Sequence, residues 1–447
     1  MKTENLQEAL NLIDDEYIEK VDKLRRGKPK KKRFLLKGIA IAACFCMVFS
    51  FVVFALLPDS ENTVKAENLM EGIVPNHIAI TSIDKGNDAY NDFAVRLFKA
   101  TEQSGKNTLI SPLSVLCALS MTANGANGET LSQMESVLGM SVRELNEYLY
   151  SYINTRPQGD KYSFDIANAI WFRDTPEFEP NRDFLQTNAD YYSAEIRKDV
   201  FDNGTLNDIN KWIDLKTDGM IPQMLDEIDP DAIMYLINAL VFEAEWEEIY
   251  EKHGIVKNYF NLENGEQVKV EYMGSTESIY LSSDDATGFI KPYKDGKYAF
   301  AAILPNEDIS ITDYVQSLSG EKLNDLFMSQ RQTTVYASMP SFETGFKTNL
   351  NDALIEMGMP LAFDSLSADF SNMGNPAGLY ISKVYHETSI AVTYTGTKAG
   401  AATVVEMNCG GMPEYEEVYL NRPYVYMIID SETNTPFFIG TMMNPNA

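Results

Sequence analysis

The residues best suited to chemistry are few in this chain of 447 residues, and their spacing does not form an enzyme site. The histidines are His77, His253 and His386, and the cysteines are Cys44, Cys46, Cys117 and Cys409. No H-E-x-x-H, P-loop or G-x-S-x-G pattern occurs, and no C-x-x-C pair or Cys/His cluster suggests a metal site. We therefore expect no catalytic centre, no metal and no cofactor.

Residues 397–407 have a composition that fits a mobile strand. Side chains of a strand alternate between two faces. One face would carry Thr397, Ala399, Ala401, Thr403, Val405 and Met407. The other face would carry Lys398, Gly400, Ala402, Val404 and Glu406. Both charges share one face, and the opposite face begins small and becomes apolar. A permanent strand is the alternative, but the small residues around Gly400 have low strand propensity. The pattern favours a strand that slips between existing strands.

The elements around this segment mix helices and strands without a βαβ rhythm. Residues 88–101 read as an amphipathic helix, and residues 112–123 as an apolar, central helix. Buried strands are predicted at residues 166–172, 298–304, 335–339, 390–394, 424–429 and 437–441. This pattern predicts an α+β fold with large sheets.

Residues 39–57 form an uncharged apolar run that is long enough to cross a bilayer as a helix. Basic residues crowd before the run and acidic residues follow it, so the N-terminus is expected in the cytoplasm and the rest outside. A cleaved signal peptide and a lipid-modified Cys44 are the alternatives, which would make the protein secreted or lipid-anchored. We expect a cytoplasmic tail at 1–37, a transmembrane helix at 38–57, a polar tether at 58–79 and a folded domain at 80–447.

Charge restricts the partners of that domain. The formal net charge is -28, although ten Lys and Arg residues lie between positions 20 and 37. An acidic body argues against nucleic-acid binding, which needs a basic surface to neutralise phosphates. Cys117 lies in the apolar helix and is predicted to be a core residue.

Several stretches from about residue 80 to residue 446 resemble the serpin family in order. They are NTLISPLSV at 107–115, ALSMTANGA at 118–126, NKWI from Asn210, TDGMI at 217–221, LINALVF at 236–242, RPYVY at 422–426 and FFIGTMMNP at 437–445. Each stretch alone is weak, but their common order is specific. The resemblance implies a serpin fold with a large sheet A, sheets B and C, eight to nine helices, an exposed reactive-centre loop and a metastable active state.

The resemblance also implies roles for the loop. In the reactive-loop hinge, Gly396 corresponds to the hinge glycine and Thr397 to the first residue that inserts; Lys398 follows, and Ala399, Gly400, Ala401 and Ala402 form the small-residue hinge. Many inhibitory relatives carry acidic residues where this chain has Tyr394 and Lys398. Lys398 lies on the outward face, whereas the bulk of Tyr394 argues against insertion. The candidates for the scissile bond are Met407, Cys409 and Gly410.

A polar cluster beneath sheet A is also implied by the resemblance. Ser111, Ser114, Asn238 and His386 match the family's shutter positions, and Trp246 matches the tryptophan at the top of the sheet. Buried hydroxyl, amide and imidazole groups can satisfy one another and rearrange when strands part. His386 is thus expected to have a structural role.

These features suggest two functions. The first is a monomeric suicide-substrate inhibitor of extracellular serine proteases, with elastase-like or subtilisin-like enzymes as the favoured partners. The second is a non-inhibitory serpin that acts as a surface binding protein, a reading that rests on Tyr394 and Lys398.

Overall fold

Helices and strands alternate irregularly along the part of the chain that the computed structural model describes, residues 64–80, 82, 84–155, 162–176, 178–251, 254–375, 378–397 and 414–447. The α-helices of these residues are α4 (Asp84–Thr101), α5 (Pro112–Ala123), α6 (Gly128–Leu138), α7 (Val142–Thr155), α8 (Arg182–Tyr192), α9 (Asn203–Lys216), α10 (Ile311–Ser317), α11 (Gly320–Met328) and α12 (Asn351–Met357). The strands are β1 (Glu67–Asn68), β2 (Thr108–Ile110), β3 (Tyr162–Arg173), β4 (Glu179–Pro180), β5 (Glu195–Asp199), β6 (Met234–Glu245), β7 (Ile255–Asn261), β8 (Gln267–Ser282), β9 (Ala286–Pro292), β10 (Tyr298–Pro305), β11 (Arg331–Pro340), β12 (Phe342–Asn349), β13 (Gly374–Asn375), β14 (Lys383–Val392), β15 (Gly396–Thr397), β16 (Tyr415–Tyr419), β17 (Tyr424–Asp430) and β18 (Pro436–Met442).

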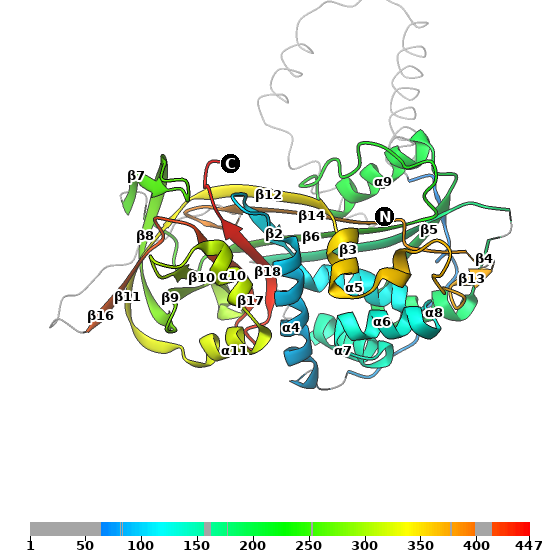
Figure 1. Cartoon of the computed structure of the whole chain (residues 1–447), viewed down its shortest axis with the longest axis horizontal. Coiled ribbons are helices and arrows are strands. Elements are labelled where there is room, and N and C mark those ends of the chain that lie inside the picture. The colour runs from blue at the N-terminus through cyan, green and yellow to red at the C-terminus, as the bar shows by residue number, and fades with distance from the viewer. Residues whose placement is uncertain are drawn as a thin grey trace, which may run out of the picture. The chain divides into compact units, whose positions relative to one another are not determined.

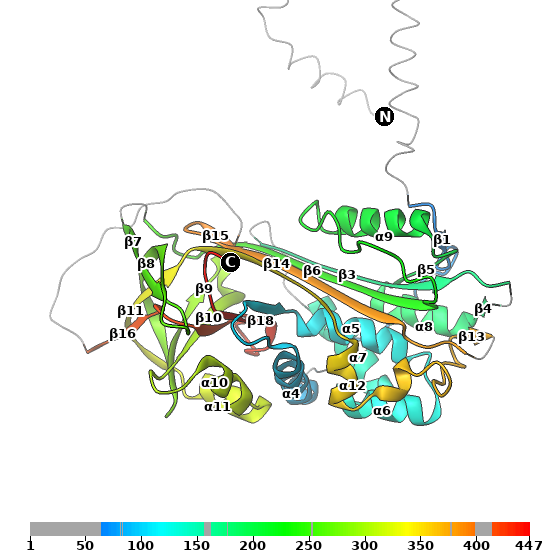
Figure 2. The ribbon, with the colours of Figure 1, turned by 45° about the horizontal axis from the view of Figure 1, so that its top comes forward.

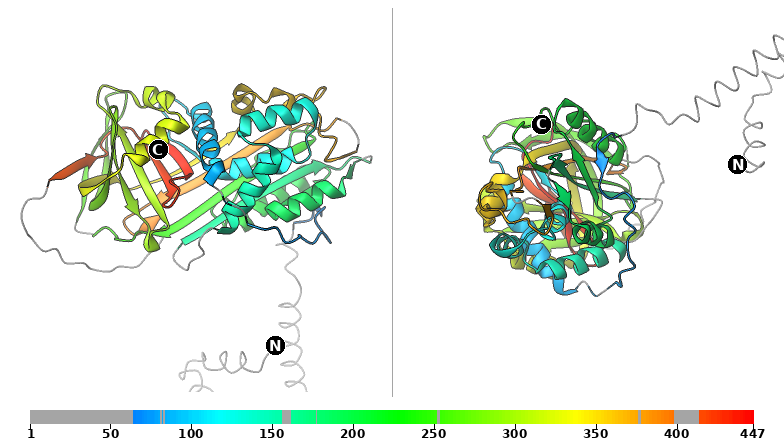
Figure 3. Two further views of the ribbon diagram at one scale, coloured as in Figure 1. Left: turned by 90° about the horizontal axis from the view of Figure 1, so that it is seen from below. Right: turned by 90° about the vertical axis from the view of Figure 1, so that its right-hand side faces the viewer.

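Sheet A is a mixed seven-stranded sheet in the order β1-β5-β3-β6-β15-β14-β12 (Figure 1). Helix α9 covers one face, and helices α5 to α8 lie on the other (Figures 2 and 3). Strand β6 is consequently buried on both sides, which explains its nearly continuous apolar sequence. Its even-numbered residues, such as Leu236 and Leu240, join the main core, whereas its odd-numbered residues Tyr235, Ile237 and Ala239 pack with Trp212 of α9.

The second large sheet has nine strands, with the path β16-β11-β8-β9-β10-β17-β18-β2 and β7 paired to β8. Strand β8 spans 16 residues and pairs with β7, β9 and β11. This one strand joins the regions expected as sheets B and C. The fold class expected from the sequence, α+β with a large sheet A and further sheets B and C, is confirmed.

Local sequence explains where the central elements begin and end. Helix α5 has the predicted bounds, Pro112 occupies its first turn, and the N-cap Ser111 accepts a hydrogen bond from the Ser114 N–H. All its residues are buried, including Cys117, as the sequence predicts. Strand β14 ends at Val392, two residues earlier than expected, because the chain then turns back toward β15.

Residues 64–79, the described part of the tether predicted at 58–79, make contacts with the folded domain. Strand β1 pairs with β5 at the edge of sheet A. The backbone N–H groups of Lys65 and Ala66 donate to the Asp208 carboxylate of α9 at 2.5 and 2.6 Å. Leu69, Met70 and Ile73 pack against the core, so a segment that looks polar overall gains both apolar burial and a shared acceptor.

Several predictions fall outside the described residues. The segments expected as cytoplasmic tail (1–37) and transmembrane helix (38–57) are among them, as are residues 398–413 of the loop. Within the described part, no helix has both the length and the apolar character needed to span a bilayer. The membrane anchor therefore remains a prediction.

Candidate functional site

Gly396 and Thr397, at the start of the predicted loop, separate strands β6 and β14 at one end of sheet A, which we call its upper end. Strand β15 lies between β6 and β14, antiparallel to both. Thr397 pairs with Val392 on one side and with Ala244 on the other, and Gly396 pairs with Glu245. The hinge therefore already begins a new strand in the middle of the sheet.

Gly396 has a positive φ of +152°, and strand β6 passes close to it. A Cβ atom at this position would collide with the carbonyl oxygen of Ala244 and lie 2.8 Å from the Cα of Glu245. Only glycine lets the two backbones approach in this way. The position that the resemblance identifies as the hinge glycine thus requires glycine on steric grounds.

The side chain of Thr397 is anchored on an aromatic pair. Thr397 is 1% exposed, and its hydroxyl lies 2.6 Å from the Tyr293 hydroxyl. Tyr293 stacks on Trp246 with a centroid distance of 4.4 Å, and the Trp246 indole N–H donates to the Thr393 carbonyl at 2.8 Å. Trp246 therefore lies at the top of the sheet beside the hinge.

Tyr394, which argued against insertion, lies in the turn before β15 rather than between the strands. Its carbonyl accepts a hydrogen bond from the Tyr250 N–H at 2.9 Å, and its half-buried side chain packs against the main core. The Thr393 hydroxyl closes the same turn by donating to the Gly396 carbonyl at 2.9 Å. The bulk of Tyr394 is thus accommodated outside the gap in sheet A.

A buried ion pair supports the aromatic pair from the second sheet. Lys291 and Glu277 are 2.8 Å apart, and their side chains are nearly inaccessible. The Lys291 ammonium group lies 4.5 Å from the Tyr250 ring centroid and 5.5 Å from that of Trp246. Removing one partner would leave an unpaired buried charge next to the hinge. The sequence reasoning missed both residues, although Lys291 is the one charged residue in the apolar stretch 286–292.

Below the hinge, the strands of sheet A are closed. β6 and β14 pair directly from Tyr235 and Lys383 up to Leu240 and Thr388. Above these pairs a hollow of about 160 Å³ remains, lined by Phe242, Ser389, Ile390 and Ala391 together with Met220 and Glu343. Strands β6 and β14 are therefore paired directly at the lower end of sheet A and separated by β15 at its upper end.

The predicted shutter residues come together beneath the closed part. The Ser111 N–H donates to Nε2 of His386 at 3.0 Å, which places the imidazole proton on Nδ1. Nδ1 then donates to Oδ1 of Asn238 at 2.5 Å, and the Ser114 hydroxyl donates to the same oxygen at 2.7 Å. Burial lowers the pKa of His386 to about 3, so the ring is neutral at pH 7.

The sequence reasoning missed one member of this cluster, Asn168 of β3. It lies in register with Asn238, which in turn lies in register with His386, so the three residues form a row across β3, β6 and β14. Because Oδ1 of Asn238 already accepts two hydrogen bonds, its amide nitrogen is the donor toward the Asn168 side-chain oxygen. Asn168 could have been identified from the sequence, because it is the only polar residue of the predicted strand 166–172.

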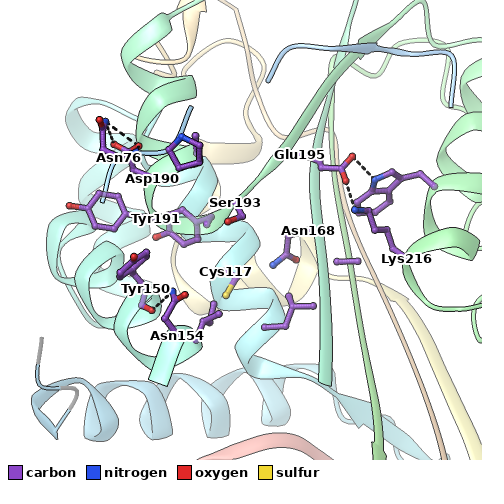
Figure 4. Close-up of a pocket in the computed structure, with 17 residues that line it drawn as sticks. Asn76, Cys117, Tyr150, Asn154, Asn168, Asp190, Tyr191, Ser193, Glu195 and Lys216 are labelled. Atoms are coloured by element: carbon purple, nitrogen blue, oxygen red, sulfur yellow. Dashed lines mark hydrogen bonds and ion pairs between the residues drawn. The ribbon is translucent and has the colours of Figure 1, made fainter. Parts of the chain in front are cut away.

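A second hollow, of about 380 Å³, lies where β5 begins, between α7, α8, α9 and β3 (Figure 4). Burial raises the pKa of the Glu195 carboxyl, but bonds from Lys216 and Trp212 outweigh this effect and lower it overall. The carboxylate is thus already neutralised by Lys216, at 2.5 Å. In the described part of the chain, no group of three His, Cys, Asp or Glu residues could hold a metal ion.

Comparison with known proteins identifies this arrangement. The family model "Serpin (serine protease inhibitor)" matches residues 88–445, and the chain belongs to the serpin family. Members of this family are mostly protease inhibitors rather than enzymes.

The chain is also similar to individual serpins. The leukocyte elastase inhibitor of Xenopus laevis is 29% identical over 80% of this chain and 98% of its own length. The thermophilic serpin tengpin in its native state has a TM-score of 0.83 and 45% identity, and it covers 85% of this chain and 100% of its own. Tengpin in its latent state has a TM-score of 0.72 and 43% identity, and it covers 83% and 99%. The structure of this chain is closer to the native form.

Proposed function

We propose that this protein is a suicide-substrate inhibitor of extracellular serine proteases, which acts by inserting residues 397–407 into sheet A. The observation that carries the proposal is the position of β15. Thr397 is paired to both β6 and β14, and Gly396 is paired to β6, directly above a closed pair of strands. A cleaved loop would therefore continue a strand that has already begun.

The chemistry belongs to the protease, and the inhibitor interrupts it. The serine of the protease attacks a peptide bond of the loop and forms an acyl-enzyme ester, which frees the residues on the N-terminal side of the cut. The freed residues then add to sheet A as a new strand, which carries the attached protease across the inhibitor. Strand addition of this kind is known for loops that insert into sheets. Distortion of the oxyanion hole and triad stalls deacylation, because both must be in place to stabilise the second tetrahedral intermediate.

Insertion is driven by the interactions that sheet A gains. Each new backbone hydrogen bond contributes roughly 0.5–1.5 kcal/mol net, and apolar residues such as Val405 become buried. The uncleaved form must lie higher in free energy than the inserted form, so a kinetic barrier has to preserve it. The buried hydrogen bonds of His386 and Asn238 would contribute to such a barrier, since they must rearrange before strands β6 and β14 separate.

The loop sequence suggests the class of target. Met407, Cys409 and Gly410, the candidates for the scissile bond, are small or unbranched residues. Such residues fit the narrow pockets of elastase-like and subtilisin-like proteases. The similarity to a protein named as an elastase inhibitor supports the same class. We also propose that residues 38–57 anchor the inhibitor in the cell membrane, with the serpin domain outside.

The test is incubation of the purified protein with trypsin-, chymotrypsin-, elastase- and subtilisin-type proteases, followed by denaturing gels and thermal melts. The expected result is a covalent complex that survives denaturant, and a nicked form that melts at a higher temperature than the intact protein. Cleavage without a complex and without a higher melting temperature would exclude insertion and favour the non-inhibitory alternative.

Thr397→Arg tests the first step of insertion. Thr397 faces Tyr293 in a buried position, so an arginine there must be desolvated without a partner. We expect the yield of covalent complex to fall by about tenfold or more, while cleavage of the loop continues. Thr397→Ser, which keeps the hydroxyl group, is the matched control and should inhibit normally. Full inhibition by Thr397→Arg would contradict the proposal.

A further inference from the structure

The turn that precedes β15 is bound by two aromatic residues. The Trp246 backbone N–H donates to the Thr395 carbonyl at 3.1 Å, and the Trp246 indole N–H donates to the Thr393 carbonyl at 2.8 Å. The Tyr250 backbone N–H donates to the Tyr394 carbonyl at 2.9 Å. Three successive carbonyl groups of the turn therefore accept hydrogen bonds from Trp246 and Tyr250.

The rings of the same two residues surround the ammonium group of Lys291. This group lies 4.5 Å from the Tyr250 ring centroid and 5.5 Å from the Trp246 ring centroid. A cation is attracted to an aromatic face at such distances, and more strongly where water is excluded, as it is around the 2% exposed Lys291. The two rings also contact each other, with their centroids 6.3 Å apart. One cation therefore holds both residues that bind the turn.

Glu277, on the neighbouring strand β8, fixes the position of this cation. Its Oε1 atom accepts a hydrogen bond from the Lys291 ammonium group at 2.8 Å, and both side chains are buried. An ammonium group has three N–H donors, so the bond to Glu277 leaves two donors for the electron-rich faces of the Tyr250 and Trp246 rings. The carboxylate and the two rings together define one place for the ammonium group.

Stability alone does not account for a charge at position 291, which lies in the otherwise apolar stretch 286–292. Apolar side chains of the same size stabilise a core as well as a buried ion pair does, because both charges of the pair lose their water. A cation differs from an apolar side chain in that it attracts two aromatic faces at once. The position of Trp246 also affects Thr397 by a second route, because Tyr293 stacks on the indole and contacts the Thr397 hydroxyl.

We propose that Lys291 and Glu277 are positioning residues for loop insertion, which hold the turn at 393–395 so that Thr397 stays at the entrance between β6 and β14. This inference rests on the proposed inhibitory function and adds to it a device that prepares the first step. A hinge that is already ordered lowers the entropy that the inserting loop must lose. Loss of the cation would free the turn and slow insertion, so that the protease completes hydrolysis in a larger share of encounters.

Replacing the pair by apolar side chains separates this role from a merely structural one. The double variant Lys291→Met with Glu277→Met leaves no unpaired charge, so its melting temperature should stay close to that of the wild type. In the full-length protein, we expect the amide protons of Trp246 and Tyr250 to exchange with deuterium about tenfold faster. The number of inhibitor molecules cleaved without trapping, for each covalent complex formed, should rise about threefold to tenfold.

Lys322→Met is the matched control. It removes the same kind of side chain from α11, where Lys322 pairs with Asp285 and lies 5.1 Å from the Tyr314 ring centroid. These partners differ from the residues that bind the turn. Amide exchange at Trp246 and Tyr250, and the yield of covalent complex, should therefore match those of the wild type.

Amide exchange and trapping together decide the outcome. Unchanged exchange at Trp246 and Tyr250 in the double variant would overturn the inference, and so would faster exchange with unchanged trapping. Lys291→Gln with Glu277→Gln is the second combination, with the same expected results, should the first fail to fold. Absence of any covalent complex from the wild type would instead overturn the proposed function, while the exchange rates would still show whether the pair holds the turn.

Discussion

At the scale of single residues, burial shifts the pKa values of two neighbouring residues on β14 in opposite directions. His386 points into the main core, and burial lowers its pKa to about 3. Glu387 points to the α9 side, and burial raises its pKa to about 7, with Lys347 opposing and Asp226 adding to this shift. Among the described residues, the Oε2 atom of Glu387 has no hydrogen-bond partner. Strand β14 therefore carries a carboxyl group that remains protonated up to about pH 7.

Glu387 is expected to make the intact protein less stable as pH rises from about 4.5 to about 7. In this window the native state keeps a proton that the unfolded chain releases, so the free energy of unfolding falls with rising pH. Glu387→Gln removes this loss and should raise the melting temperature at pH 8 by about 2 °C, with little change at pH 5. His386 has the opposite slope below about pH 6.5, because only the unfolded chain takes up its proton there.

Thermal melts of the intact protein between pH 5 and pH 8 provide the measurement. Glu343→Gln, a change of an exposed glutamate on the neighbouring strand β12, is the matched control and should leave the wild-type pH dependence intact. An unchanged pH dependence in Glu387→Gln would show that the carboxyl group is ionised at no cost to the native state.

At the scale of elements, residues 64–76 connect α9 to the edge of sheet A. The Asp208 side chain accepts both the Lys65 and Ala66 N–H groups, while β1 adds a strand to β5. Further along the segment, the Asn76 N–H donates to Asp190 of α8 at 2.7 Å. The sequence of this segment is polar and without periodicity, so its place in the fold depends on acceptors that lie more than a hundred residues away.

Asp208→Ala is expected to lower the free energy of unfolding by about 1–3 kcal/mol, because two backbone N–H groups lose their acceptor in a buried place. Asp208→Asn keeps one side-chain oxygen and should cost clearly less. Denaturant titration measures both changes, and limited proteolysis should cut the Asp208→Ala variant faster between residues 64 and 76. Equal stability of the Asp208→Ala variant and the wild type would show that the two bonds do not hold the segment in place.

At the scale of the whole molecule, the protein combines an acidic serpin body with a basic, apolar N-terminal region. The structure resembles the native state of tengpin more than its latent state. The formal net charge of -28 disfavours polyanionic partners, because the body would repel them. An inhibitor held at a cell surface would protect that surface rather than the surrounding fluid.

The membrane anchor can be tested on the full-length chain expressed in bacterial cells. We expect the protein in the membrane fraction, resistant to high salt and released by detergent, because about 20 apolar residues insert stably. Externally added protease should digest the serpin domain of intact spheroplasts, and deletion of residues 38–57 should move the protein to the soluble fraction. Recovery of a shortened chain from the medium would favour the cleaved signal peptide instead.

Most of the fold could be predicted because its signals are local. The helix at 112–123 is apolar on all sides and begins with a serine cap and a proline, so both its bounds and its burial follow from its own residues. The end of strand β14 was predicted two residues too late, since it depends on hydrogen bonds between Thr393 and Gly396 in a turn. The separation of sheets B and C was also less sharp than expected, because the length of β8 joins them.

The sequence by itself determined the family, because several stretches follow the family order, and this resemblance implied the hinge glycine and the grouping of Ser111, Ser114, Asn238 and His386. Only the tertiary structure decided that Thr397 already lies between β6 and β14, that Asn168 completes the polar row, and that Lys291 and Glu277 form a buried pair. These contacts join strands that are distant in sequence. Their register is determined by packing against α9 and the main core, and no local pattern of residues encodes it.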